Sequence, residues 1–287
     1  MPLTTTTTAD TTIPELWSAI TADQREENLI IFNMFDRRYE EEARGKPYDI
    51  IHIQGISNYA TGAVTLGVGG TLSSEAMVFA TQINLTINTH IYHLIDIEYE
   101  AELMSNISLM EKGAGKSGYA MALSMDDTLA GLVDDFSTNA LGQLAVGLDE
   151  DDVRTAARML DDAIAPTDNR FLVVAPIQLR NLQGQEAFRN SLYKEAVGTL
   201  SANAATRQYH GKIYGAGLYA TGNVEGSNAA GHDNGMWHKE SVAVAVIDNM
   251  RVRSFYEITT DSDQRAVHAI YGQVEVRDDH GVFMRGL

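Results

Sequence analysis

The chain has 287 residues, 44% of them hydrophobic, which is enough to bury one large core or two small ones. Its 21 Lys and Arg against 39 Asp and Glu give a net charge of −18, which argues against a nucleic-acid reader, because such a protein needs a basic surface. The sequence has no Cys for disulfides or thiolate sites, and no apolar run approaches the roughly 18 residues that span a membrane, so we expect no membrane partner.

The N-terminal part combines a featureless stretch with a helix. Residues 1–12 are rich in Thr and predict a flexible arm. A helix is expected to begin at Pro14 and to end in the charged cluster 36–42, because Gly45 and Pro47 follow.

Two strand signals come next, at Ile51–Ile53 and over residues 83–97. In the second, Ile and Leu occupy odd positions, a period of two that predicts one strand of about 50 Å. The residues between the two signals are rich in Gly and Thr, and loops of about 26 residues are usually functional or mobile. We therefore expect a projecting arm whose apolar face, including Leu85 and Ile87, is completed by a neighbouring molecule.

Residues 98–136 show helical spacing of apolar residues, which predicts a helix of roughly 57 Å at about 1.5 Å per residue. Gly113, Gly115 and Gly118 interrupt the pattern, so a kink or short break is expected there. Residues 96–162 contain 15 acids and 4 bases, which we interpret as solvated helix faces. Such a surface would also suit a protein that stays near DNA without adhering to it.

The second half of the chain gives mixed signals. Four acids from Asp149 complement a helix dipole, so a helix is expected from there to Pro166. Phe171–Ala175 predicts a buried strand, and Pro176 is expected to begin a short helix. The other expected elements are a helix over 185–200, a strand over 213–219, a loop over 221–235, strands over 242–247, 250–258 and 267–276, and a final hairpin through 278–281 into 282–284.

Several chemical motifs can be weighed and set aside. Met110–Ser117 is similar to a phosphate loop, but it lacks the first Gly and follows a helical stripe rather than a strand. Gly215–Ala220 matches a loosened dinucleotide fingerprint without the helix that would bind a pyrophosphate. His232, Asp233 and His238 could ligate a metal, but their spacing matches no recognised site.

Two further patterns are equally weak. Ser191 and Lys194 have the spacing of a serine–lysine nucleophile, but its companion motifs are missing. Adjacent acids, at 126–127, 134–135 and 161–162, diverge by about 100° on a helix, which favours solvated faces over acid–base pairs. We therefore expect no catalytic, cofactor-binding or metal-binding residues, and a protein that is not an enzyme.

A long helix, a projecting arm and a mixed α/β region are predicted, and no active-site motif is found. This combination is typical of a subunit that assembles with other molecules. In Asn169–Pro176 and from Ser254 to Gly281, the chain resembles major capsid proteins of tailed bacteriophages, which share the Hong Kong-type (Johnson) capsid fold. The resemblance implies an α+β fold with an N-terminal arm, an extended β-hairpin loop, a peripheral domain with a long spine helix, and an axial domain. Its implied divisions are the arm at 1–45, the extended loop and its strands at 46–97, the spine helix at 98–148, mainly axial domain at 149–245, and C-terminal strands returning to the peripheral domain at 246–287.

The resemblance also implies a function. Copies of the chain would form hexamers and pentamers of an icosahedral shell around double-stranded DNA, without sequence-specific contacts, assembled in the host bacterial cytoplasm. Implied partners are a portal protein and, in some relatives, a cement protein, and the short stretch before the first helix implies a separate scaffolding protein. An encapsulin-type compartment holding cargo enzymes and an uncharacterised α+β enzyme are the alternatives.

Overall fold

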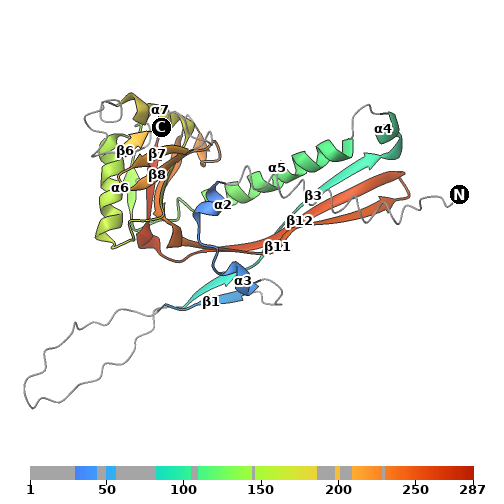
Figure 1. Cartoon of the computed structure of the whole chain (residues 1–287), viewed down its shortest axis with the longest axis horizontal. Coiled ribbons are helices and arrows are strands. Elements are labelled where there is room, and N and C mark those ends of the chain that lie inside the picture. The colour runs from blue at the N-terminus through green and yellow to red at the C-terminus, as the bar shows by residue number, and fades with distance from the viewer. Residues whose placement is uncertain are drawn as a thin grey trace, which may run out of the picture.

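A computed structural model of the chain describes residues 30–43, 50–55, 82–104, 109–143, 146–185, 198–200, 209–227 and 230–287. These residues form three parts: an eight-stranded body, a rod made of a three-stranded sheet and a long helix, and a two-stranded ribbon (Figure 1). The body lies at one end, the rod extends away from it, and the ribbon leaves near their junction (Figure 1). The expected α+β class is confirmed. The predicted flexible arm at 1–12 and most of the predicted loop between the ribbon strands lie outside the described residues.

The body is built on a mixed sheet with the strand order β4-β13-β10-β5-β8-β7-β6, and β9 pairs with β10. Two of its pairs are parallel, β13 with β4 and β5 with β8. Its strands are β4 (Ala140–Gly142), β5 (Arg170–Val174), β6 (Gly198–Leu200), β7 (Tyr209–Ile213), β8 (Ala216–Ala220), β9 (Gly226–Ser227), β10 (Gly231–His238) and β13 (Gly281–Gly286).

Local sequence signals explain the two helices of the body, α6 (Glu150–Asp162) and α7 (Pro176–Gly184). Asp149 caps α6, because its carboxylate accepts from the Asp152 amide at 2.9 Å and the Asp152 carboxylate accepts from the Asp149 amide at 3.1 Å. Pro176 occupies the first turn of α7, where its missing N–H costs nothing. Both predicted helix starts are confirmed.

The rod joins β11 (Val242–Glu257), β12 (Ser262–Glu275) and β3 (Thr89–Glu98) in one antiparallel sheet, with α5 (Leu109–Ala130) packed on it. A short helix, α4 (Tyr99–Met104), lies at its far end (Figure 1). The register of β11 against β12 shifts at two places between Val246 and Arg251, a bulge that re-aims the strand as it leaves the body.

A kink or short break was expected at Gly113–Gly118, and the structure shows no break there, because α5 is continuous through these residues. Its sheet-facing side is made of small residues and Met, and Ala114 and Met121 pack against Val267 and Ala269 of β12. Close packing of the helix on the sheet adds dispersion contacts that offset the cost of the glycines.

The ribbon pairs β1 (Ile50–Ile53) with β2 (Ile83–Thr86). The single strand expected over 83–97 is therefore two strands, since β3 pairs with β12 in another sheet. Residues Thr86 and Ile87 cross directly over Gly272, where an added Cβ would lie 2.3 Å from the Thr86 carbonyl oxygen. This close crossing ties the ribbon to the rod.

The apolar face of the ribbon is covered by the chain itself. Leu85 is fully buried and Ile87 nearly so, in a cluster that includes Ala243 and Ala245 of β11 and Ala43 of the short helix α3 (Glu40–Ala43). The expectation that a neighbouring molecule completes this face is therefore wrong. Odd-position periodicity showed which side of the strand is buried, but not which segment covers it.

Three other expectations are corrected. Residues 213–219 form the β7–β8 hairpin, turning at Tyr214 and Gly215, whose φ of 45° and 82° are typical of a type I′ turn. The predicted loop 221–235 contains β9 and most of β10. The predicted terminal hairpin is absent, because β13 pairs with β10 and β4 rather than with β12.

The N-terminal helix expected to reach the charged cluster 36–42 is also corrected. In its described part the chain forms two single turns, α2 (Ile31–Met34) and α3 (Glu40–Ala43). Between them Phe35 stacks on Trp237 of β10, with ring centroids 5.3 Å apart. Asp36 then makes a parallel bridge with Ala243, so tertiary contacts override the helical pattern. Most of the helix predicted over 185–200 lies outside the described residues.

Candidate assembly surfaces

The motifs weighed in the sequence do not form sites. Met110–Ser117 lies within α5, and Gly215 lies in the β7–β8 turn, so neither begins a phosphate-binding loop. Within the part of the chain that the structure describes, no group of three or more His, Asp or Glu could hold a metal ion. No described helix is long and apolar enough to cross a membrane. Ser191 and Lys194 lie outside the described residues.

His232, Asp233 and His238 lie along β10 but have different partners. Asp233 lies 3.2 Å from Nε of Arg285 on β13, and burial raises the pKa of its carboxyl group while Arg285 lowers it. His238, at the other end of the strand, packs edge-on against His280, with ring centroids 5.9 Å apart. His238 therefore lies apart from His232 and Asp233, and the three do not form one site.

Asp126 is fully buried, which corrects its expected place on a solvated helix face. It lies on α5, and its carboxylate accepts from the backbone amides of Ile30 and Phe32 and from the Asn223 side chain, each at 3.4 Å. Burial raises its pKa to about 6, against the lowering effect of these hydrogen bonds. Asp126 thus anchors the start of α2 to the rod helix. Its spacing from the buried Ala122 and Leu129 was the available signal, because positions three and four apart share a helix face.

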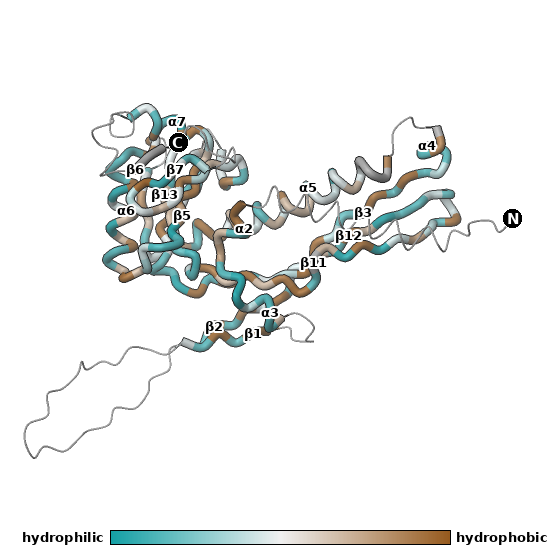
Figure 2. Tube along the Cα trace, viewed as in Figure 1, coloured by the Kyte–Doolittle hydropathy of each residue, from teal (hydrophilic) through white to brown (hydrophobic). Residues whose placement is uncertain are grey.

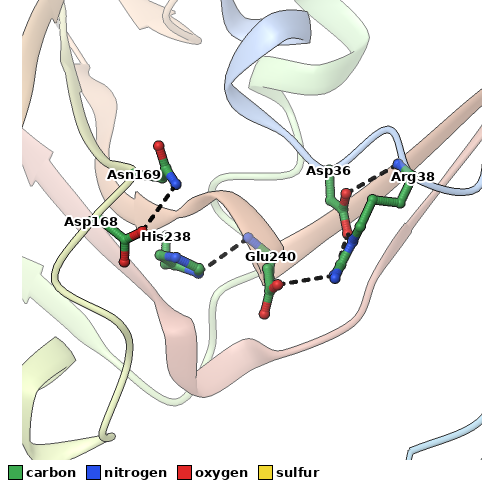
Figure 3. A network of polar contacts seen from close by, with 6 residues as sticks. All are labelled: Asp36, Arg38, Asp168, Asn169, His238 and Glu240. Carbon is green, nitrogen blue, oxygen red and sulfur yellow. Dashed lines mark hydrogen bonds and ion pairs between the residues drawn. The ribbon is translucent and has the colours of Figure 1, made fainter.

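A hollow of about 420 Å³ lies at the base of the ribbon. It is lined by apolar residues that include Ile53 and by the charged side chains of Asp36, Arg38 and Glu240. Nε of Arg38 donates to Asp36 at 2.7 Å, and another guanidinium nitrogen lies 3.0 Å from Glu240 (Figure 3). Nδ1 of His238 in turn accepts from the Glu240 amide at 3.2 Å. The network links the ribbon base to the body.

Near this junction, His238, His280 and Glu275 have shifted pKa values. His238 caps the short turn η2 (Lys239–Ser241), and His280 ends the short turn η3 (Asp278–His280). Burial lowers the pKa of both rings. Close by, burial and the Asp278 carboxylate raise the pKa of Glu275 to about 7. Asp278 accepts from Thr138 and its neighbours, which lowers its own pKa, so Glu275 is the member of the pair that holds the proton.

One face of the rod sheet packs against α5, and the opposite face is open. On that open face Tyr92, Leu94 and Phe255 are 67%, 47% and 48% exposed. Nε2 of His90 lies 3.2 Å from Nδ1 of His268 beside them. Figure 2 shows hydrophobic residues recurring along the rod out to its far end. Exposed apolar surface of this kind is typical of a contact with another macromolecule.

The outer side of α5 is a further apolar surface. Tyr119 and Leu123 are 48% and 37% exposed. They lie opposite the small residues that face the sheet, and Leu123 borders a hollow of about 590 Å³ beside residues 222–226. Together with the exposed Tyr99 and Leu103 of α4, they extend the apolar surface along the rod. The described chain thus offers broad surfaces suited to macromolecular contacts.

Comparison with solved structures finds the same architecture in phage shells. The chain is similar to the capsid structure of cyanophage P-SCSP1u, with a TM-score of 0.70, 13% identity, and coverage of 90% of this chain and 88% of that one. It is similar to the capsid of Ralstonia phage GP4 with a TM-score of 0.68, 14% identity, and coverage of 91% and 87%.

A shell that is not viral also has this architecture. The holo-SrpI encapsulin complex of Synechococcus elongatus matches with a TM-score of 0.57, 9% identity, and coverage of 83% of this chain and 81% of that one. No protein-family profile matches the sequence, and neither does any curated protein. At these identities the likeness concerns the fold, which extends over nearly the whole chain. The chain has the Hong Kong-type capsid fold found in these phage capsids.

Proposed function

We propose that the chain is a major capsid subunit that assembles with copies of itself into an icosahedral shell of hexamers and pentamers around double-stranded DNA. The observation that carries the proposal is the likeness to phage capsids over about nine-tenths of both chains. The exposed apolar surfaces of the rod support it, because a shell subunit needs several contacts on different faces. A structural, non-enzymatic role follows from the same proposal.

The proposal gives each part of the chain a role. The ribbon and the residues it carries would be the extended loop, the rod the peripheral domain with α5 as spine helix, and the body the axial domain. Because β13 lies in the body's sheet, the strands that return to the rod are β11 and β12 rather than all of 246–287. The N-terminal arm would lie against neighbouring copies.

Partners follow from the same role. A scaffolding protein would guide assembly in the host bacterial cytoplasm, a portal would occupy one vertex, and a cement protein could strengthen the outer surface. The packaged DNA would meet a subunit of net charge −18, which disfavours adhesion to phosphates. Location in the virion capsid is part of this proposal.

An encapsulin-type shell is the second candidate, favoured by the structural likeness to the SrpI encapsulin complex. The two phage capsids named above match with higher TM-scores, 0.70 and 0.68 against 0.57, so we prefer the capsid role.

Electron microscopy of the chain, expressed with the products of its neighbouring genes, tests the proposal. Closed shells of uniform diameter that fill with DNA when the packaging proteins are present would support the capsid role. Shells that instead enclose one protein cargo would favour the encapsulin role. A monomer that forms no shell under any of these conditions would refute both.

A further inference from the structure

Two histidine side chains lie next to each other on the open face of the rod sheet. His90 belongs to β3 and His268 to β12, and the register pairs His90 with Ile270 and His268 with Tyr92. The two histidines are therefore diagonal neighbours on one face of adjacent strands. Nε2 of His90 lies 3.2 Å from Nδ1 of His268, and the ring centroids are 5.3 Å apart.

The distance between these two nitrogens fits a bound metal ion as well as a hydrogen bond. Two imidazole nitrogens that bind one Zn²⁺ at about 2.0–2.1 Å are about 2.9 Å apart at a right angle and about 3.4 Å apart at the tetrahedral angle. His90 is exposed and His268 is half-buried, so rotation about their side-chain torsions can turn both nitrogens towards one ion. Imidazole is a common ligand of zinc, copper and nickel.

The surroundings of the pair also bear on metal binding. Burial, followed by repulsion from His90 and Arg253, lowers the pKa of His268, which favours the neutral ring that a metal requires. Arg251 acts in the same direction, and the carboxylate of Asp248 acts in the opposite one. Both arginines are exposed, so water and salt weaken their repulsion of a divalent ion.

We propose that His90 and His268 bind one divalent transition-metal ion, of the class of Zn²⁺. Nε2 of His90 and Nδ1 of His268 are the ligands, and each ring keeps its hydrogen on the other nitrogen. Because no third His, Asp or Glu of the described residues joins them, water fills the remaining positions. The proposal departs from the expectation of no metal-binding residues. The two histidines are 178 positions apart, so no motif spacing could indicate the pair.

The ion binds where the ribbon joins the rod. β3 begins at Thr89, directly after the chain has crossed over Gly272. Ile270, which pairs with His90, packs against the cluster that buries Leu85 of the ribbon. A metal that links β3 to β12 at this point holds the base of the ribbon on the rod sheet. An unfolded chain does not hold the two rings together, so the ion also stabilises the folded subunit.

Isothermal titration calorimetry with ZnCl₂ tests the site, using unassembled subunits without a histidine tag. The wild type should bind one Zn²⁺ per subunit at its tightest site. His90→Gln and His268→Gln should each raise the Kd of this site at least tenfold, because each removes one of two ligands. His93→Gln is the matched control, since His93 lies on the same strand but pairs with Val267 on the face that packs against α5. Its Kd should stay within about twofold of the wild type.

Thermal unfolding gives a second readout. At a free Zn²⁺ concentration of about 100 times Kd, the melting temperature of the wild type should rise by about 5 to 8 °C. The double variant His90→Gln/His268→Gln should show no such rise. In EDTA the double variant should melt within about 3 °C of the wild type, which separates loss of the metal from loss of the fold.

Three results would overturn the proposal. The first is a wild type that binds no Zn²⁺, and the second is the same Kd in the wild type and in both single variants. The third is an equal loss of affinity in His93→Gln, which would show that binding depends on the fold of the rod rather than on the two rings. These measurements use free subunits, so their result does not depend on whether the chain forms shells.

Discussion

Replacing Leu85 with Ala should destabilise the free subunit, before any assembly takes place. Leu85 is fully buried by the chain's own residues, in the cluster that joins the ribbon to β11. Truncating a buried Leu typically costs 2–5 kcal/mol through lost transfer energy and the cavity left behind. For a chain of this size we take about 3 kcal/mol and roughly 3 °C for each kcal/mol, which predicts a melting temperature lower by about 9 °C.

The measurement is thermal unfolding of purified, unassembled subunits by circular dichroism. Ile50→Ala is the matched control, because Ile50 lies on the same ribbon but is 44% exposed. It should lower the melting temperature by no more than about 3 °C. If Leu85→Ala melts with the wild type and fails only in shell formation, a neighbouring molecule covers this face and the packing described here is refuted.

Three further predictions concern buried polar groups. The pKa of Asp126 is raised to about 6, so its contribution to stability is full below about pH 4 and is lost as pH rises through 6. Denaturant titrations at pH 4 and pH 7.5 should show that Asp126→Asn lacks this loss, of about 3 kcal/mol. Glu275, with a pKa raised from 4.5 to about 7, should give a loss of stability between about pH 4.5 and 7, detectable as a smaller change in melting temperature over this range in Glu275→Gln. Arg170→Met leaves the carbonyls of Ala165 and Pro166 without their donor and should lower the free energy of unfolding by about 3 kcal/mol in the same titrations.

For each of these predictions, one outcome would contradict the reasoning. A difference between wild type and Asp126→Asn that stays constant with pH would mean that Asp126 titrates normally. An unchanged pH profile in Glu275→Gln would mean that the Asp278 pair does not hold a proton near neutrality. Wild-type stability of Arg170→Met would mean that the turn at Ala165 and Pro166 does not depend on Arg170.

Elements with a local cause could be predicted from the sequence. The start of α6 follows from the reciprocal hydrogen bonds of Asp149 and Asp152, and the start of α7 from Pro176, both set within a few residues. The buried strand β5 was equally clear from its run of apolar residues. These signals depend on no distant part of the chain.

Elements with a distant cause could not be predicted in this way. The Gly and Asn residues of β10 suggested a loop, but Gly235 is small because a Cβ there would lie 2.5 Å from Val133. The Asn234 side chain accepts a hydrogen bond from the Ala175 amide at 2.7 Å, just beyond the end of β5. The cover over Leu85 likewise depends on Gly272, which lies far along the chain. The hydrophobic pattern shows which side of a strand is buried, but the topology of the sheets determines which segment covers that side.

Close packing of α5 on the rod sheet explains why two of its large apolar residues, Tyr119 and Leu123, point away from the core. A helix that lies close on a sheet needs small side chains between the two, and Ala114 and Gly118 occupy that side. Tyr119 and Leu123 are left on the outer side, where about half and over a third of their surfaces stay in water. Fully burying a large apolar side chain contributes about 2 kcal/mol, so each forgoes part of that in the free subunit. Contact with another molecule recovers it, which makes this part of the hydrophobic free energy available to assembly rather than to folding.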